Sequence, residues 1–200
     1  MTAMLDALIL DLGNVLVFHD NALLFEKMSA AFGTTADSMR ARIEKDVWTR
    51  TNTGLLPGDT LRVELQNALG GTMTPARFAE LWNCHFQING PMVERVESLV
   101  GKVKLCLLSN THDLHFEPLR KQLPVLEKFD ARVLSYEEGL MKPSPELYRT
   151  ALKRVGVEAN RAAFFDDVQA YADAATAVGI HGRLFTDVAT FDADLAKLRR

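Results

Sequence analysis

The chain has few of the residues that mark several large classes of protein. Only two cysteines, Cys84 and Cys106, occur among its 200 residues, far apart and each in an apolar context. We therefore expect two buried thiols and no disulfide framework. The net charge is −3, which argues against a general nucleic-acid binder or a membrane-surface protein.

Long hydrophobic runs are also missing. No uninterrupted apolar stretch reaches the ~18 residues of a membrane span. Asp6 and Asp11 interrupt the apolar stretch near the N-terminus, and no basic segment precedes it. This stretch therefore predicts a core strand rather than a signal peptide, and the protein is expected to be cytoplasmic. Apolar residues make up 48% of the chain, enough for one large domain or for a core with a small insertion.

The most informative segment is an apolar run that ends in a carboxylate. Residues 8–16 read Leu-Ile-Leu-Asp-Leu-Gly-Asn-Val-Leu, with Asp11 followed closely by Gly13 and Asn14. Such a run beside turn residues predicts a buried strand. Open α/β sheets bind ligands at the carboxyl ends of their strands, so Asp11 is a candidate nucleophile or metal ligand.

Three later segments offer groups that complement Asp11. A second apolar run ends at Ser109 and its following amides, and a third ends at Asp166 and Asp167. A cation, Lys142, precedes a proline in the loop between them. Mg²⁺ prefers oxygen ligands and keeps several waters, so one or two carboxylates suffice to hold it. Together these groups predict a site for phosphate and Mg²⁺.

The segment from about residue 21 to 87 has only helical periodicity, and its turn signals divide it into four amphipathic helices. These are expected at 21–32, 36–51, 57–69 and 74–86. We interpret residues 18–87 as a four-helix cap, inserted just after the first site segment and well placed to act as a lid.

The rest of the chain alternates between strands and helices. Together with the stretch at 5–17, this alternation predicts an α/β fold with a parallel sheet and helices on both faces. The core then comprises residues 1–17 and 88–200 as a Rossmann-like, three-layer unit. Strands are expected at 103–108, 131–135, 162–165 and 183–185, and helices at about 92–100, 113–122, 144–155, 168–177 and the C-terminus.

The four site segments, in this order and with an inserted helical cap, resemble the haloacid dehalogenase-like (HAD) hydrolase superfamily. The resemblance covers essentially the whole chain. The Asp-Leu-Gly-Asn-Val motif is most similar to a branch that includes α-glucose-1-phosphate phosphatases and the phosphatase domain of soluble epoxide hydrolases. The implied fold is a Rossmann-like core with a cap, and the implied activity is phosphoryl transfer.

The resemblance also implies roles for individual residues. Asp11 would attack phosphorus and form an aspartyl-phosphate, while Lys142 neutralises both the nucleophile and the transferring group. Ser109 and the backbone amide of Asn110 would hold the phosphoryl oxygens. Because a carboxylate approaches a phosphate only when their mutual charge is offset, a cation at this place is also what physical chemistry requires.

The metal ligands implied by the resemblance are Asp11, the backbone carbonyl of Gly13, and Asp167. Asp166 lies beside Asp167 as a further ligand or as its supporting partner. The ion expected at this site is Mg²⁺.

Two positions depart from the pattern of the superfamily. Gly13 stands where most members carry an Asp that acts as general acid and base, and a glycine cannot donate a proton. Either turnover is slow or limited to good leaving groups such as anomeric phosphates, or His19 or Asp20 supplies the proton. The second departure is Tyr171, which stands where relatives often carry an Asn that supports the metal.

Side chains of the cap suggest further roles. Arg50 is a forked donor that suits an anionic substrate, and the alternative is an ordinary surface arginine. Phe78, Trp82 and Phe86 recur at helical spacing and are expected in the core of the cap. His112 and His115 form an i, i+3 pair that we interpret as solvated helix residues, with a metal site as the alternative.

These observations predict a Mg²⁺-dependent phosphatase of small phosphorylated metabolites, with a sugar phosphate as the expected substrate. One alternative is a 2-haloacid dehalogenase on the same scaffold, although that reaction needs no Mg²⁺ and leaves Asp166 and Asp167 unexplained. Another is a catalytically weak phosphate-binding or regulatory protein, which Gly13 keeps open. A phosphomutase and a phosphonate hydrolase fit less well. The expected partner is a small phosphate ester, and the protein is expected to be a monomer or homodimer.

Overall fold

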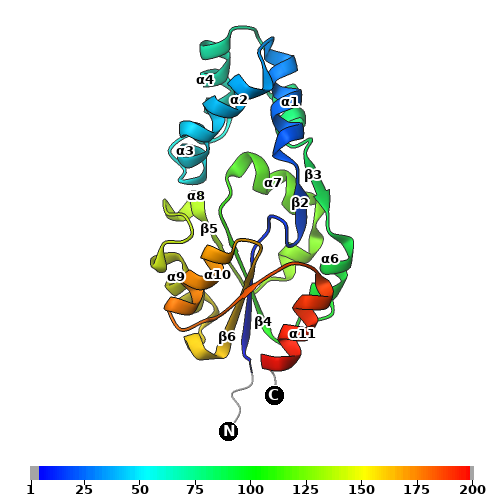
Figure 1. Ribbon diagram of the computed structural model, residues 1–200, viewed down its shortest axis with the longest axis vertical. Helices are drawn as coiled ribbons and strands as arrows, with labels where there is room; N and C mark the ends of the chain where they lie inside the picture. The colour runs from blue at the N-terminus through cyan, green and yellow to red at the C-terminus, as the bar shows by residue number, and fades with distance from the viewer. Residues whose placement is uncertain (1–4, 199–200) are drawn as a thin grey trace.

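The computed structural model describes residues 5–198, and its elements form two groups (Figure 1). A parallel sheet flanked by helices makes up one end of the molecule. A group of helices, α1 to α5, makes up the other end, and two short strands lie between them. This arrangement confirms the expected α/β class with a Rossmann-like core.

Five parallel strands form the sheet in the order β5-β4-β1-β6-β7. The register pairs Leu10 with Leu107 on one side and with Phe165 on the other. The carboxyl ends of the three central strands therefore lie at one edge of the sheet. Their bounds are β1 (Ala7–Leu10), β4 (Lys104–Ser109), β5 (Ala131–Leu134), β6 (Ala162–Asp166) and β7 (His181–Leu184).

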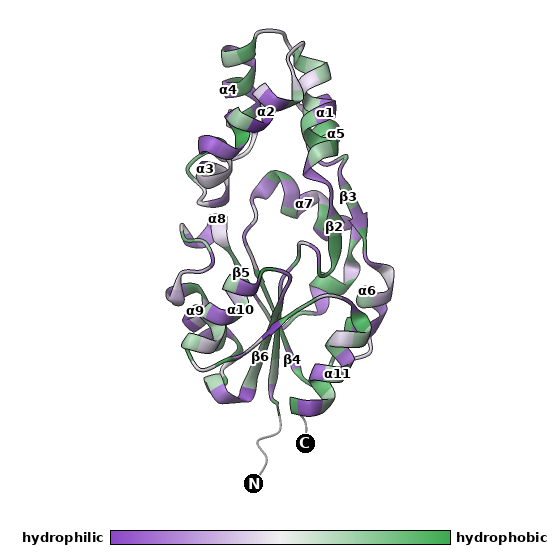
Figure 2. Ribbon diagram, in the orientation of Figure 1, coloured by the Kyte–Doolittle hydropathy of each residue, from purple (hydrophilic) through white to green (hydrophobic). Residues whose placement is uncertain are grey.

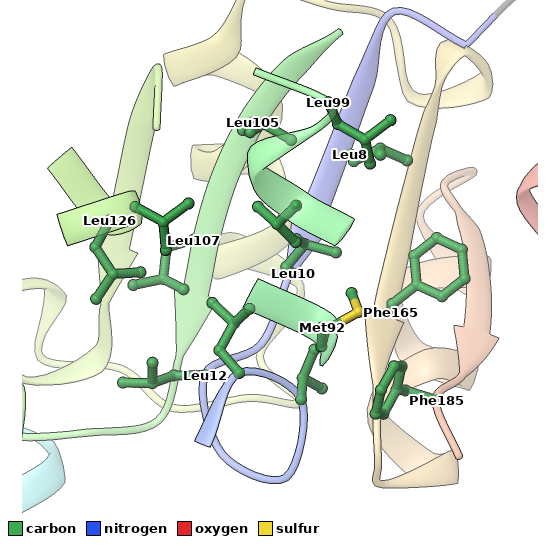
Figure 3. Close-up of a cluster of buried hydrophobic side chains, with 14 of the residues drawn as sticks. Leu8, Leu10, Leu12, Met92, Leu99, Leu105, Leu107, Leu126, Phe165 and Phe185 are labelled. Atoms are coloured by element: carbon green, nitrogen blue, oxygen red, sulfur yellow. The ribbon is translucent and has the colours of Figure 1, made fainter. Parts of the chain in front are cut away.

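Helices cover both faces of the sheet, so the central strands are buried and largely apolar, with polar residues only at their ends (Figure 2). One face packs against α6 (Gly90–Glu97), α7 (Asp113–Gln122) and α11 (Val188–Leu198). Figure 3 shows part of this cluster, in which strand residues face Met92 and Leu99. The strand side chains of this cluster include Leu8, Leu10, Leu105, Leu107 and Phe165.

The opposite face packs against α9 (Pro145–Val155) and α10 (Gln169–Ala177). Its strand residues alternate with those of the first face, as a period of two requires. They include Ala7, Ile9, Cys106, Leu108 and Phe164. Three short helices complete this part: η2 (Pro124–Lys128), α8 (Ser135–Glu138) and η3 (Ala159–Arg161).

Helices α1 to α5 have a hydrophobic cluster of their own, which includes Phe25, Phe78 and Trp82. Thr35 and Thr74 cap α2 and α5 by accepting hydrogen bonds from backbone N–H groups. The helix expected at 36–51 contains a π-helical turn. The bounds are α1 (Asn21–Phe32), α2 (Ala36–Arg42), η1 (Ile43–Val47), α3 (Trp48–Asn52), α4 (Asp59–Leu69) and α5 (Pro75–Trp82).

Two expectations about the junction with the cap are wrong. The strand expected over 5–17 ends at Leu10, and a separate strand, β2 (Val17–His19), follows a turn. The helix expected to reach residue 86 ends at Trp82, and β3 (Phe86–Ile88) pairs antiparallel with β2. Phe86 thus lies on a strand rather than in the helical core. A three-residue strand is too short to show its period in the sequence.

Two further expectations from the sequence concern the two cysteines and membrane-spanning segments. Both thiols are free; Cys106 is buried in β4, whereas Cys84 is exposed in the turn after α5, against expectation. Within residues 5–198, no helix has the length and apolarity that crossing a bilayer demands.

Candidate active site

A cavity of about 470 Å³ lies between the carboxyl edge of the sheet and the cap. Its volume falls in the range of roughly 300–1,000 Å³ that is typical of small-molecule sites. Asp11, Ser109, Lys142 and Asp167 all line it, although they come from distant parts of the sequence. The topology explains the convergence, because the strands before three of them end at one edge of the sheet.

An ammonium group joins two carboxylates at the base of this cavity. Lys142 Nζ lies 2.9 Å from Asp11 Oδ1 and donates a hydrogen bond to Asp166 Oδ2 at 2.5 Å. The side chains of Lys142 and Asp166 are 1% and 0% exposed. Asp166 also accepts a hydrogen bond from the backbone N–H of Val168 at 2.9 Å. A buried cation and its carboxylates hold one another in place here, since each is costly to bury alone.

Burial and charge act in opposite directions on these groups. Burial disfavours the charged form of Lys142, but the Coulombic attraction of Asp11 and Asp166 outweighs it and raises the pKa of Lys142. Burial, together with the negative charge of Asp11, raises the pKa of Asp166 to about 6 despite the opposing effect of Lys142. Lys142 therefore stays cationic beside the candidate nucleophile at neutral pH.

The site also has the donors that a divalent cation needs. One carboxylate oxygen from each of Asp11, Asp166 and Asp167 lies within 4.8 Å of the other two. Oδ1 of Asp11 is buried and, within residues 5–198, contacts Lys142 Nζ at 2.9 Å but accepts no further hydrogen bond. A carboxylate oxygen with spare acceptor capacity beside two further carboxylates fits a hard cation such as Mg²⁺. Gly13, expected to contribute its carbonyl, lines the same cavity.

The loop after β4 is held by side-chain hydrogen bonds. Ser109 is buried at the end of the strand and lines the cavity. The side chain of Asn110 accepts a hydrogen bond from the Lys142 N–H at 2.7 Å and donates to the Lys142 carbonyl at 3.1 Å. Asn110 thus fixes the backbone that carries the cation, a contact that sequence reasoning missed. Ser135 similarly pairs with both backbone groups of Thr111 at 2.9 Å.

Asn14 is a second residue that sequence reasoning missed. Its Nδ2 donates a hydrogen bond to Asp167 Oδ2 at 2.8 Å and lies 3.2 Å from His19 Nε2. Its φ of 51° is in the left-handed region, which Asn tolerates better than most residues. The signal in the sequence was its place three residues after Asp11, which we interpreted only as a turn.

The structure separates the two candidates for the missing acid and base. The imidazole of His19 lines the cavity and lies close to Gly13: a Cβ at Gly13 would come within 3.3 Å of His19 Cδ2. Asp20 instead caps α1, where its carboxylate accepts hydrogen bonds from the N–H groups of Ala22 and Leu23. The expectation that Asp20 could serve is therefore wrong, because its side chain is used outside the cavity.

The structure also places Arg50 away from the expected substrate. Its guanidinium forms a two-bond pair with Glu64, at 2.8 and 2.9 Å, and contacts Asp46 at 2.9 Å. Arg50 does not line the cavity. A paired, forked donor has little left to offer a phosphate, so the assignment of Arg50 to substrate binding is wrong.

Contrary to expectation, His112 is buried, and His115 is only half-buried and lines the cavity. His112 is 1% exposed, and its ring centroid lies 4.0 Å from that of His115. Trp82 Nε1 donates to His112 Nε2 at 3.4 Å, and His85 packs against His115 with ring centroids 5.3 Å apart. Burial lowers the pKa of His112 to about 3, that of His85 to about 4, and that of His115 well below 6.5. The cap covers this helix start, which the sequence of α7 alone does not reveal.

Tyr171, which departs from the pattern of the superfamily, contacts the cation. Lys142 Nζ lies 5.2 Å from the centroid of the Tyr171 ring and 5.5 Å from that of Phe164. Both rings are within reach of a favourable cation–π interaction. Tyr171 also lines the cavity. It therefore supports the lysine, a role that its position in the sequence does not suggest.

A parallel α/β sheet that gathers three carboxylates, one of them a candidate nucleophile, and a buried lysine at one edge is an arrangement suited to hydrolytic group transfer. The chain belongs to the haloacid dehalogenase-like hydrolase family, whose model matches residues 5–179.

Individual relatives are similar over nearly the whole chain. The sesquiterpene phosphatase astK of Aspergillus oryzae is 28% identical over 185 residues, covering 90% of each chain. A predicted HAD-like hydrolase of Porphyromonas gingivalis superposes with a TM-score of 0.85 at 22% identity, covering 99% of each chain. A HAD family enzyme of Bacteroides thetaiotaomicron, solved with magnesium and inorganic phosphate, has a TM-score of 0.82 at 24% identity, covering 91% of this chain and 94% of that one.

Proposed function

We propose that this protein is a Mg²⁺-dependent phosphatase that hydrolyses small phosphorylated metabolites through an aspartyl-phosphate on Asp11. The observation that carries the proposal is the contact between Lys142 Nζ and Asp11 Oδ1 at 2.9 Å, with three carboxylates within reach of one metal ion. This combination offsets the charge that otherwise keeps a carboxylate from a phosphate. The phosphatase activity of astK, a relative over 90% of the chain, agrees with it.

In the first step, a carboxylate oxygen of Asp11 attacks phosphorus and the bond to the ester oxygen breaks. Lys142 holds Asp11 in place and neutralises the negative charge that gathers around phosphorus. Ser109 and the Asn110 amide bind the phosphoryl oxygens at the end of β4. In the second step, water attacks the same phosphorus, the bond to Asp11 breaks, and phosphate leaves.

Asp11, Asp166, Asp167 and the Gly13 carbonyl are the proposed ligands of Mg²⁺. When bound, the ion adds positive charge beside the phosphoryl oxygens and orients the group for in-line attack. Inorganic phosphate and magnesium occur together in the Bacteroides thetaiotaomicron enzyme, which has the same fold.

His19 is the proposed acid and base in place of a side chain at position 13. In its protonated form it gives a proton to the leaving oxygen in the first step, and it takes a proton from the attacking water in the second. Such help is typically worth 10²–10⁴-fold. When release of the leaving group is followed in a single turnover, His19→Ala should therefore slow the first step with glucose 1-phosphate by about 10²-fold or more and with p-nitrophenyl phosphate much less, because p-nitrophenolate leaves unaided. Asp20→Asn, which alters only a helix cap, serves as the matched control; equal effects on both substrates would contradict the role of His19.

The residues that line the cap side of the cavity support a sugar phosphate as substrate. Asn21, Glu44, Thr49 and Asn52 line the cap side and can exchange hydrogen bonds with hydroxyl groups, and Trp48 adds an aromatic face. A hydrocarbon chain would leave these polar groups unpaired. We propose that residues 18–87 act as the cap that closes over such a substrate and excludes water.

A panel of phosphate esters tests the proposal. With Mg²⁺, the purified protein should hydrolyse p-nitrophenyl phosphate and sugar monophosphates, and removal of Mg²⁺ with a chelator should abolish turnover. Binding of phosphate without turnover of any ester would instead favour a phosphate-binding or regulatory protein. Release of halide from a 2-haloacid without Mg²⁺ would favour a dehalogenase, and the carboxylate trio is the observation against that reaction.

A further inference from the structure

The cap side of the cavity is presented by a helix with an unusual turn. Residues 43–47 are π-helical, and the N–H of Trp48 donates to the carbonyl of Ile43, five residues earlier. Ile43 and Val47 are buried in the hydrophobic cluster of the cap, while Glu44 and Trp48 line the cavity. A π turn is rare and often occurs at a functional site. Here the wider turn keeps Glu44, Trp48 and Asn52 on the side that faces the substrate.

Glu44 is an unneutralised carboxylate at this end of the cavity. Glu44 forms no ion pair or side-chain hydrogen bond with any residue between 5 and 198, whereas the nearby Asp46 and Glu64 both pair with Arg50. Among the same residues, Lys142 is the only lysine or arginine that lines the cavity, and it is paired at the opposite end. The described lining of the cap end therefore offers a negative charge and no lysine or arginine to pair with it.

We propose that Glu44 is a specificity-determining residue: it accepts hydrogen bonds from the hydroxyl groups of the leaving group and rejects substrates that carry a second negative charge. This inference rests on the proposed phosphatase function. A carboxylate accepts up to four hydrogen bonds and donates none, so it matches neighbouring hydroxyl groups. A second phosphate at the same place would meet a like charge, and no described lysine or arginine lines the cap end of the cavity to offset it.

The test compares two substrates that differ in one phosphate, glucose 1-phosphate and glucose 1,6-bisphosphate. The wild-type protein should prefer the monophosphate. In Glu44→Gln, kcat/KM for the monophosphate divided by kcat/KM for the bisphosphate should fall by about fivefold or more, as expected for removing one like-charge contact in a hydrated site. Glu44→Lys should lower this ratio further. The change should fall mainly on KM, since the contact is present before and during the reaction. Asp37→Asn, which removes an equal charge from the exposed start of α2, should leave the ratio unchanged.

The outcomes of the test separate this inference from the proposed function. Turnover of p-nitrophenyl phosphate, measured with every variant, reports on the reacting end of the cavity and serves as reference. Turnover of that ester with a substrate ratio unchanged within twofold in both Glu44 variants would overturn the role of Glu44 and leave the phosphatase standing. A ratio that falls equally in Asp37→Asn would also overturn it, because the effect would then reflect the overall charge of the cap. Lack of turnover of every ester would refute the proposed function and this inference with it.

Discussion

The two ends of the cavity are built by different means. At the sheet end, Asp11, Lys142 and Asp166 are buried, paired with one another and attached to strand ends or to a loop fixed by Asn110. At the cap end, Glu44 and Thr49 are exposed positions of one helix. A change at the sheet end disturbs several buried charges at once, whereas a change at the cap end alters one contact. The groups proposed to react with the phosphate are thus fixed by several contacts. The side chains proposed to contact the leaving group can be substituted one at a time.

The strongest test of this contrast removes the nucleophile. Asp11→Asn should lower kcat on p-nitrophenyl phosphate by at least about 10³-fold, since loss of a covalent nucleophile removes the reaction path and not one contact. Circular dichroism should remain that of the folded protein. Asp173→Asn changes an exposed carboxylate on α10 that accepts a hydrogen bond from Gln169, and this variant should keep its activity. A variant of Asp11 with more than a tenth of wild-type turnover would contradict the proposed path.

The second test compares a buried with an exposed lysine. Lys142→Met leaves Asp11 and Asp166 buried without their cation, and we expect it to lower the free energy of unfolding by about 3–5 kcal/mol. Lys104→Met breaks an exposed pair with Asp130 and should cost at most about 1 kcal/mol. Urea unfolding of both variants measures the difference. Equal losses would mean that the sheet end is no more constrained than the surface.

The third test uses pH to destabilise the histidine cluster that lies where the cap meets the core. His85, His112 and His115 have pKa values lowered by burial, so below about pH 6.5 the unfolded chain binds protons that the folded chain does not. Their contribution to stability is complete above pH 6.5 and is lost as pH falls from there toward about 4. Each should reduce the free energy of unfolding by up to about 1.4 kcal/mol per pH unit.

Urea unfolding at pH 7.5 and pH 5.0 measures this loss. His112→Asn should reduce the difference between the two pH values, because one buried site for a proton is gone. His181→Asn, at a histidine on β7 outside the cluster, is the matched control and should leave the difference unchanged. A wild-type protein equally stable at both pH values would refute the interpretation.

The smallest expected effect concerns the contact between the cap and the core. Gly54 has φ of 74°, and a Cβ there would overlap with the carbonyl oxygen of Tyr136. Gly54→Ala should cost about 1 kcal/mol for the backbone alone and raise KM for a sugar phosphate by holding the cap away from α8. Gly33→Ala has a similar φ of 64° but nothing near its Cβ, so it isolates the backbone effect. If both variants keep the wild-type KM, this contact does not position the cap.

The core was predictable from the sequence because its signals are strong and repeated. Strands buried on both faces, such as β4 and β6, appear as unbroken apolar runs. Their order along the chain then places Ser109 and Asp166 beside Asp11, since parallel strands end at one edge. Helix α1 was predicted at its observed bounds from its amphipathic pattern and from Gly33 at its end, although the cap at Asp20 was not recognised.

The errors concern contacts between segments that are distant in the sequence. The sequence suggests that Arg50 is unpaired, but in the structure Glu64 of α4 pairs with it. The sequence also suggests that His112 is solvated, but Trp82 of α5 contacts it. Asn14 looks like a turn residue until β6 brings Asp167 within 2.8 Å. Local patterns do not encode these pairings, because they depend on how the cap packs on the core.

The closeness of His19 to Gly13 restricts how this site can change during evolution. The superfamily pattern that the sequence resembles has an Asp at the position of Gly13, and a Cβ added there would lie 3.3 Å from the present imidazole. A side chain at position 13 would therefore require the imidazole to shift by a few tenths of an ångström. A lineage that changes one of these positions also changes the space available to the other. The two residues form a coupled pair.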